Sequence, residues 1–390
     1  MIEFSLPDSA IQLVSEVKDF LDEHLTPAVR EHERRTGDGH NWEFSRALAQ
    51  KRWVLPTWPV EMGGAGLGDF AYAVLVQELY RAEAPLVGVN TTQMPAAVIR
   101  DLGSDHLQRG ILPEIAAGEA IVCLGLTEPH AGSDLAAVTT RARRDGGDWV
   151  IDGQKMFTTL AHIAQYCYLL ARTTPDSVRH NGLTVFMVPM DTPGIQVTPI
   201  RTVAGERTNA VFFDAVRIPD EARIGQVDGG WDVMRHALGL EHQAGSFCGA
   251  AQRLWSGAVA AAQRYTDTES RRLIDLPANR ERLARAAVHN EITQLLHHRT
   301  IWLAANGQEA HVAGAETKLY SAETFIEDAA ALADMLGPNV LSAYDGTDAD
   351  AAGIVGHSYQ YSAGTSIYGG TSEIMRGLIA EHGLGLPKAR

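Results

Sequence analysis

The chain has 390 residues, of which 45% are hydrophobic and 21% charged, values that suit a globular protein of two or three domains. Its formal net charge of −15 argues against nucleic acid or an anionic membrane surface as the main partner. The start, "MIEFSLPDSAIQ", has no basic, apolar leader, and no apolar run reaches about 18 residues. We therefore expect a cytoplasmic protein with no membrane span. Cys123, Cys167 and Cys248 lie far apart, which predicts free, buried thiols in a reducing compartment.

The first third of the chain is expected to be helical. Residues 9–25 place apolar side chains on one helical face, and 43–53, 70–82 and 105–117 also have helical patterns with Gly and Pro between them. These segments predict an N-terminal helical domain over residues 1–120.

The pattern changes near residue 121. Short β-prone runs follow one another without intervening helices, separated by Pro, Gly and Asn: "YCYLLART", "LTVFMVPM", "IQVTPI" and "AVFFDAVRIP". The Asp152-Gly153 pair in "DWVIDGQKMF" predicts a hairpin turn. Residues 121–228 are thus expected to form a small antiparallel β-barrel or sandwich.

The remaining residues, 229–390, are expected to be helical again. Ala- and Leu-rich segments at 231–266, 279–306 and 309–336, with a last helix at 371–383, predict a C-terminal four-helix bundle. The fold class is therefore α+β, in the order helical domain, β-domain, bundle. We expect no metal site: His297 and His298 are adjacent, point to different helix faces, and suit a solvated helix surface.

One segment carries most of the functional signal. It is "CLGLTEPHAGSDLAAVTTRARRDGGDWVIDGQKMFTT", residues 123–159, and it resembles the acyl-CoA dehydrogenase family. The resemblance continues in three further stretches in the family's order, at 53–67, 103–119 and 366–387. It implies non-covalent FAD, held between the β-domain and the bundle, and an acyl-CoA substrate.

The resemblance also assigns roles to residues near the flavin. "TEPHAGSD" offers a glycine and small polar groups that let backbone N–H donors approach a ring edge. The matching family segment gives Leu126 and Thr127 to the flavin and Ser133 to the boundary between flavin and substrate. In "KMFTT", Phe157 stands where the family usually has Trp beside the flavin, and Thr159 carries the hydroxyl near flavin N5. We expected these two to share one face of a strand. The other FAD contacts implied are Leu124, Gly132, Thr158, Tyr368, Thr371 and Glu373.

The segment "YGGTSEI" raises a question about the catalytic base. Thr371 or Ser372 can cap a helix, and the glycines let backbone approach the cofactor. The Gly369 N–H is expected to polarise the thioester carbonyl, as an oxyanion-hole donor does. The medium-chain type of dehydrogenase has its catalytic Glu at the position of Gly369, where this sequence has no side chain.

A second family pattern supplies a base. In the isovaleryl and long-chain types, the Glu lies on the first bundle helix, 11 positions past the second Gly of a glycine turn, and that count from Gly230 reaches Glu241. A partly desolvated carboxylate has a raised pKa, which suits a base. The resemblance therefore implies α,β-dehydrogenation, with Glu241 taking the α-proton and FAD the β-hydride.

The sequence departs from the family at two places. His242 replaces the Arg that commonly follows the base, and the Arg-x-x-Phe-Gly motif is missing from 268–285, although Arg271 and Arg272 are present. Such divergence resembles dehydrogenases of bulky CoA thioesters, some of which pair two unlike subunits.

Three readings therefore remain open. The chain is a catalytic dehydrogenase that passes electrons to an electron-transfer flavoprotein, a non-catalytic partner subunit, or a flavin oxidase or monooxygenase. We expect an oligomer, either of identical chains or with an unlike acyl-CoA dehydrogenase subunit.

Overall fold

The computed structural model describes residues 7–241, 247–342 and 351–388. They divide into two compact units: the first joins residues 7–34, 68–84, 247–342 and 351–388, and the second joins 35–67 and 85–241. In the described ranges, none of the helices combines the length and apolar character needed to cross a membrane.

The first unit is built of helices. From the N-terminal part come α1 (Asp8–His24), α2 (Pro27–Thr36), which runs just past the unit's boundary, and α4 (Asp69–Arg81). The C-terminal part supplies α8 (Cys248–Arg264), α9 (Pro277–Ala305), α10 (His311–Leu336), α11 (Ala351–Thr365) and α12 (Ser372–Leu378), which continues as a π-helical turn over Ile379–Gly383.

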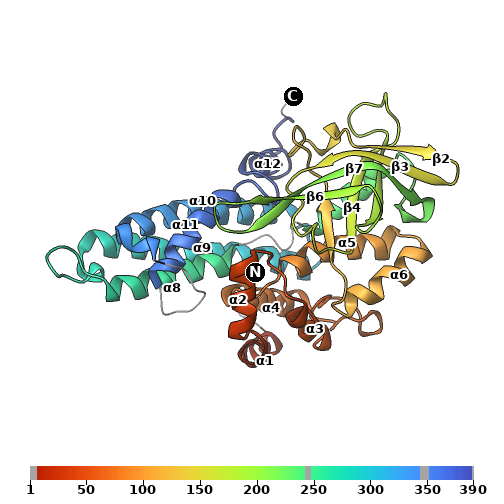
Figure 1. Cartoon of the computed structure of the whole chain (residues 1–390). Helices are drawn as coiled ribbons and strands as arrows, with labels where there is room; N and C mark the ends of the chain where they lie inside the picture. The colour runs from red at the N-terminus through yellow and green to blue at the C-terminus, as the bar shows by residue number, and fades with distance from the viewer. Residues whose placement is uncertain (1–6, 242–246, 343–350, 389–390) are drawn as a thin grey trace. The chain divides into compact units, whose positions relative to one another are not determined.

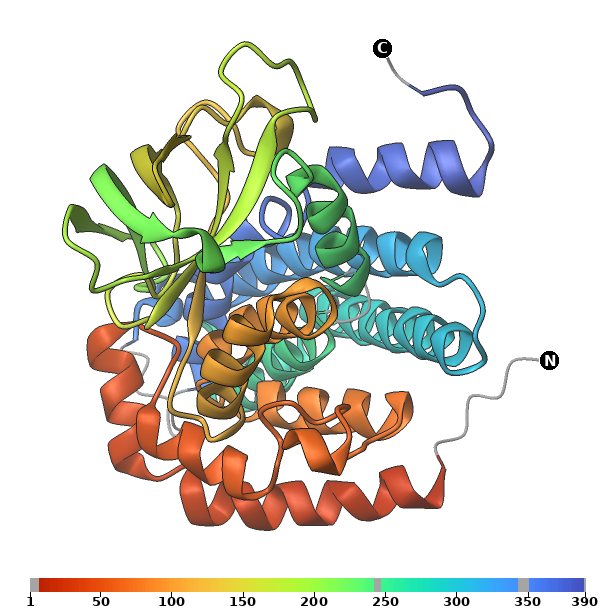
Figure 2. The same cartoon turned by 90° about the vertical axis from the view of Figure 1, so that its right-hand side faces the viewer.

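Helices α8, α9, α10 and α11 lie alongside one another and form the expected four-helix bundle (Figures 1 and 2). Buried Leu, Ala and Phe side chains fill the space between them, including Leu254, Phe325 and Leu332. Two expectations for this region were wrong. Within 231–266 the structure describes two helices, α7 (Gly230–Glu241) and α8, of which α7 belongs to the second unit and not to the bundle. The buried helix α11 was missing from the prediction.

The second unit combines a sheet with four helices: α3 (Trp42–Gln50), α5 (Val87–Leu102), α6 (Asp105–Ala116) and α7 (Gly230–Glu241). Local sequence fixes several helix ends. The side chain of Asn41 accepts a hydrogen bond from Phe44 N at the start of α3, and Ser104 does the same for Leu107 N at the start of α6.

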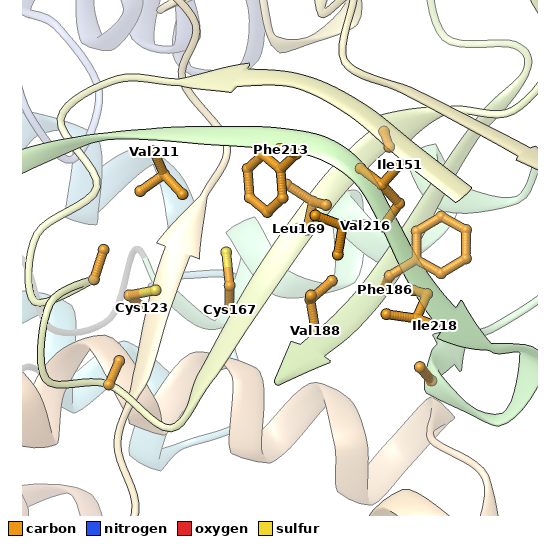
Figure 3. Packing of buried hydrophobic residues seen from close by; sticks show 14 of the residues in the cluster. Cys123, Ile151, Cys167, Leu169, Phe186, Val188, Val211, Phe213, Val216 and Ile218 are labelled. Carbon is orange, nitrogen blue, oxygen red and sulfur yellow. The ribbon is translucent and has the colours of Figure 1, made fainter. Parts of the chain in front are cut away.

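The sheet has eight strands: β1 (Val122–Gly125), β2 (Arg141–Asp145), β3 (Asp148–Lys155), β4 (Tyr166–Arg172), β5 (Leu183–Pro189), β6 (Ile195–Arg201), β7 (Arg207–Pro219) and β8 (Arg223–Ile224). Its order is β6-β7-β3-β2-β4-β5-β8, with β1 beside β4 (Figure 1). Most neighbours are antiparallel, as expected, but β1 and β2 each pair with β4 in parallel. One face is packed with apolar side chains, among them Cys123, Cys167, Phe186 and Phe213 (Figure 3).

The prediction of a hairpin at Asp152-Gly153 was wrong. These residues lie inside β3, where the register with β7 shifts between Ile151 and Gly153, and the hairpin turn lies instead between β2 and β3. Gly153 has φ 150°, and a Cβ there would stand 2.6 Å from Thr140 Oγ1. The glycine therefore serves a β-bulge and a close approach of backbone, the other common use of Gly within a strand.

The expectation for His297 was also wrong. Its side chain is buried in the bundle, and burial together with the neighbouring His298 lowers the pKa of His297 to about 4. The three cysteines are buried, as expected.

Candidate active site

The loop after β1 carries the first group of expected flavin contacts. Leu124, Leu126 and Thr127 are half-buried, whereas Gly132 and Ser133 are exposed. The loop closes on itself, because Glu128 N donates to Ala131 O at 2.9 Å and Ala131 N donates to Glu128 O at 3.1 Å. The backbone N–H and hydroxyl groups at 132–133 are thus open to a ligand.

A tight turn after β3 carries the second group. Phe157 has φ 55° and is 61% exposed, an unusual combination for a large aromatic residue. Because β3 ends at Lys155, Phe157 and Thr159 do not share a strand face, and that expectation was wrong. The turn is held by backbone hydrogen bonds from Thr159 N to Phe157 O at 3.0 Å and from Thr158 N to Asn209 O at 2.9 Å.

The hydroxyls of this turn differ in their surroundings. Thr159 is half-buried, and its Oγ1 donates to Thr208 Oγ1 at 3.2 Å. Thr158 is fully buried, and its Oγ1 has no hydrogen-bond partner among the residues that the structure describes. Met156 N donates to Thr127 O at 2.9 Å, so the turn and the loop after β1 lie side by side. An exposed ring beside free backbone donors and hydroxyls fits one edge of a flavin ring.

The glycine turn at 369–370 belongs to the first unit. Gly369 has φ 64° and Gly370 has φ 88°, both in the left-handed region that glycine tolerates. Thr371 caps α12 by accepting a hydrogen bond from Ile374 N at 3.3 Å, as the sequence predicted. An open pocket of about 380 Å³ adjoins the turn; its lining residues include Ser366, Thr371 and Glu373.

A buried lysine lies next to this turn. Lys318 of α10 is 7% exposed and donates to Thr365 O at the end of α11. Its ammonium lies 4.9 Å from the ring centre of Phe247 and 5.5 Å from that of Tyr368. A Cβ added at Gly369 would meet Lys318 Cε at 3.7 Å. Sequence analysis did not single out Lys318, although a lone Lys among Ala, Thr and Leu in a helix is a visible signal.

Glu241 is the last residue of α7, so the count from Gly230 runs along a single helix. The side chain of Glu241 and all of His242 lie outside the described part of the structure. Helix α7 packs against α5 and β5 in the second unit.

The arginines of the divergent stretch are engaged locally. Arg271 Nε and Nη2 donate to Asp267 Oδ2 at 2.8 and 2.6 Å, and Arg272 Nε donates to Asp275 Oδ2 at 2.9 Å.

Comparison with known proteins identifies the family to which the segments of this candidate site belong. Three family models match in order: the acyl-CoA dehydrogenase N-terminal domain at residues 7–119, the middle domain at 123–216 and the C-terminal domain at 228–384. The acyl-CoA dehydrogenase FadE26 of Mycobacterium tuberculosis is 31% identical over 395 residues, which cover 97% of each chain. The chain belongs to the acyl-CoA dehydrogenase family.

Solved structures of this family agree over the whole chain. The chain is similar to a structure described as the Tcur3481-Tcur3483 steroid ACAD, at 31% identity and a TM-score of 0.88, over 99% of this chain and 100% of that one. It is also similar to the ChsE4-ChsE5 complex of M. tuberculosis, at 29% identity and a TM-score of 0.89, with the same coverage. Acyl-CoA dehydrogenases of this family are FAD-dependent, so the loop and turn described above are candidates for holding that cofactor.

Proposed function

We propose that this chain is a catalytic acyl-CoA dehydrogenase that introduces a double bond between the α- and β-carbons of an acyl-CoA thioester. Family membership supports the reaction class, and the turn at Phe157–Thr159 is the observation that carries the cofactor site. Its exposed ring, together with the exposed backbone of the adjoining loop at 132–133, suits FAD, which when bound would take up the β-hydrogen as hydride.

Under this proposal, each of the following residues has a role in binding the cofactor. The Phe157 ring would pack beside the flavin, and the Thr159 hydroxyl would lie near N5. Leu124, Leu126, Thr127, Gly132, Thr158, Tyr368, Thr371 and Glu373 complete the cofactor contacts, and Ser133 lies between flavin and thioester. These assignments follow the motifs of the family position by position.

Glu241 acts as the base. In its carboxylate form it takes the α-proton, so the substrate loses one proton and one hydride and gains one carbon–carbon double bond. The Gly369 N–H donates a hydrogen bond to the thioester oxygen and stabilises the negative charge that grows there as the proton leaves. Gly369 has no side chain to crowd that N–H, and glycine tolerates its φ of 64°.

We further propose that the enzyme works as an oligomer and passes its electrons to an electron-transfer flavoprotein. One relative of known structure is described as the ChsE4-ChsE5 complex, and another carries the double designation Tcur3481-Tcur3483. In the stretch without Phe-Gly, Arg271 and Arg272 are held in local ion pairs. The partner is either a second copy of this chain or an unlike acyl-CoA dehydrogenase subunit.

The same relatives suggest which class of acyl-CoA this chain acts on. One of them is described as a steroid enzyme, so we propose a bulky, steroid-like acyl group as the first candidate. Anaerobic addition of acyl-CoAs, from short branched to steroidal, to the purified protein tests this through loss of the oxidised flavin band near about 450 nm. Bleaching by a bulky thioester supports the proposal. A protein that stays colourless with added FAD until an unlike chain is co-expressed favours a non-catalytic partner subunit, and rapid reoxidation by oxygen favours an oxidase.

A further inference from the structure

A fully buried ion pair lies beneath the candidate flavin site. Lys155 Nζ stands 2.9 Å from Glu128 Oε1, and the two side chains are 0% and 1% exposed. Burying two charges is expensive, and a well-packed apolar pair often serves folding as well or better. The two side chains also contact the backbone of separate segments and join them.

Glu128 anchors its own loop to the segment that leads into β2. Oε2 accepts hydrogen bonds from Thr139 N at 2.7 Å and Thr139 Oγ1 at 2.9 Å, and Oε1 accepts one from Thr140 N at 2.9 Å in addition to Lys155. The half-exposed His130 ring also lies close, with its Nε2 3.6 Å from Oε2. Three protein donors and one ammonium thus fix the carboxylate.

Lys155 ties the same loop to the start of the Phe157 turn. Its Nζ donates to Leu126 O at 3.1 Å, and the next residue, Met156, donates its N–H to Thr127 O at 2.9 Å. Leu126 and Thr127 precede the exposed residues Gly132 and Ser133, and Phe157 follows Lys155 by two positions. The pair therefore sets the spacing between the two segments that would hold the flavin ring.

We propose that Glu128 and Lys155 are positioning residues that preorganise the flavin cradle by fixing the loop at 126–133 against the turn at 157–159. Neither residue touches the flavin; both act through the backbone groups that they hold. This inference rests on the FAD site of the proposed function, and it is independent of Glu241.

The test measures FAD affinity and flavin environment in the absence of substrate. Glu128→Gln, Lys155→Met and the double variant are titrated with FAD after flavin removal, and visible circular dichroism of the bound flavin is recorded. We expect FAD binding to weaken by about 10- to 100-fold, the range for losing one or two hydrogen bonds to a charged group, with an altered flavin signal. The double variant, which leaves no unpaired buried charge, should regain thermal stability but not FAD affinity.

Two controls separate positioning from folding. Val188→Ala removes buried volume from the same sheet, where Val188 is 0% exposed, and should lower the melting temperature while leaving FAD affinity within about twofold. Thr139→Val, at an exposed position, removes only one hydrogen bond to Glu128 and should weaken FAD binding several-fold in a folded protein.

The outcomes are distinct. If the double variant and Thr139→Val bind FAD as tightly as the parent, with the same flavin spectrum, the pair is only structural and the proposal is wrong. If the single variants do not fold, the double variant and Thr139→Val still show whether the pair affects FAD binding. If the parent itself binds no FAD, the proposed cofactor site fails, whatever the variants do.

Discussion

Phe157 combines strain with exposure, and both point to a ligand. A side chain in the left-handed region costs about 1–2 kcal/mol, which a 61% exposed ring does not recover by packing in the protein alone. Contact between the Phe157 ring and a flavin ring would supply stabilising free energy that offsets this backbone cost. The residue thus offers a way to separate folding from cofactor binding.

Phe157→Gly and Phe157→Ala make a matched pair for this purpose. Both lose the ring, but only glycine relieves the backbone strain, so we expect the glycine variant without FAD to exceed the alanine variant in unfolding free energy by about 1 kcal/mol. Both should bind FAD more weakly than the parent. Chemical unfolding and FAD titration measure the two effects. Unchanged FAD affinity in both variants would show that the ring does not contact the flavin.

The Glu128 carboxylate should make the free energy of unfolding depend on pH in the acid range. Burial raises the pKa of Glu128, but the Lys155 ammonium and the Thr139 and Thr140 hydrogen bonds outweigh it and lower the pKa to about 2. Because the folded pKa lies below the unfolded one, this stabilisation is complete above about pH 4.5 and disappears as the pH falls toward about 2.

We therefore expect the difference in unfolding free energy between the parent and Glu128→Gln to shrink by up to about 3 kcal/mol over that interval. Urea unfolding at a series of pH values measures it. A difference that stays constant from about pH 5 to pH 2 would contradict this assignment of the carboxylate's pKa.

At the scale of helices, Lys318 links α10 to the end of α11 and to the glycine turn. Lys318→Met keeps the aliphatic stem and removes the donor to Thr365 O, so we expect a loss of about 1–3 kcal/mol of unfolding free energy and slower flavin reduction by substrate. Arg376→Met is the control, since its ion pair with Glu323 is exposed on both sides and should contribute less than about 1 kcal/mol. Equal effects of the two substitutions would remove any special role for Lys318.

Helix α9 carries an apolar stripe toward solvent. Val288 and Leu295 are 56% and 48% exposed and lie two helical turns apart, with Ala284 exposed and Ile292 half-buried on the same side. Such a stripe on a bundle helix supports the proposed oligomer.

Val288→Asp together with Leu295→Asp should dissociate the oligomer at micromolar concentration, because each aspartate would bury a charge in the interface. Ile11→Asp, at a 55% exposed position on α1, serves as the control and should leave the assembly intact. Light scattering reports the mass. An unchanged oligomer in the double variant would place the interface elsewhere.

Sequence patterns predicted the elements that have a clear period or a clear boundary. Strands β4 to β7 were found because Pro, Gly and Asn separate short β-prone runs. Helix α11 was missed because its first six residues are buried on all sides and rich in Gly and Ala, which leaves no polar face to reveal a helical period. The Asp152-Gly153 bulge was mistaken for a turn because both uses of glycine look alike without the partner strand.

In the candidate site, too, local sequence patterns did not predict contacts between residues far apart in the chain. The motifs pointed to backbone segments for a flavin site, and two of them, the loop at 126–133 and the turn at 157–159, lie side by side in the structure. The count from Gly230 to Glu241 runs along one helix. The buried pair of Glu128 and Lys155 joins residues 27 positions apart, and the local sequence around either residue does not predict its partner. The same holds for Lys318, whose partner Thr365 lies 47 positions along the chain.

At the scale of the whole molecule, family membership and similarity to solved relatives over 99% of the chain establish the dehydrogenase fold. Whether this chain performs the reaction depends on its base, because Gly369 offers no carboxylate. Glu241 at the end of α7 is the residue on which the catalytic reading depends.

Anaerobic stopped-flow reduction of the flavin by a good acyl-CoA substrate, in the parent and in Glu241→Gln, tests this claim most directly. Glutamine keeps the shape and removes the basic carboxylate, so folding and FAD content should persist while flavin bleaching slows by about two to four orders of magnitude. Flavin reduction in Glu241→Gln as fast as in the parent would contradict the assignment of the base and would favour a site completed by an unlike partner subunit.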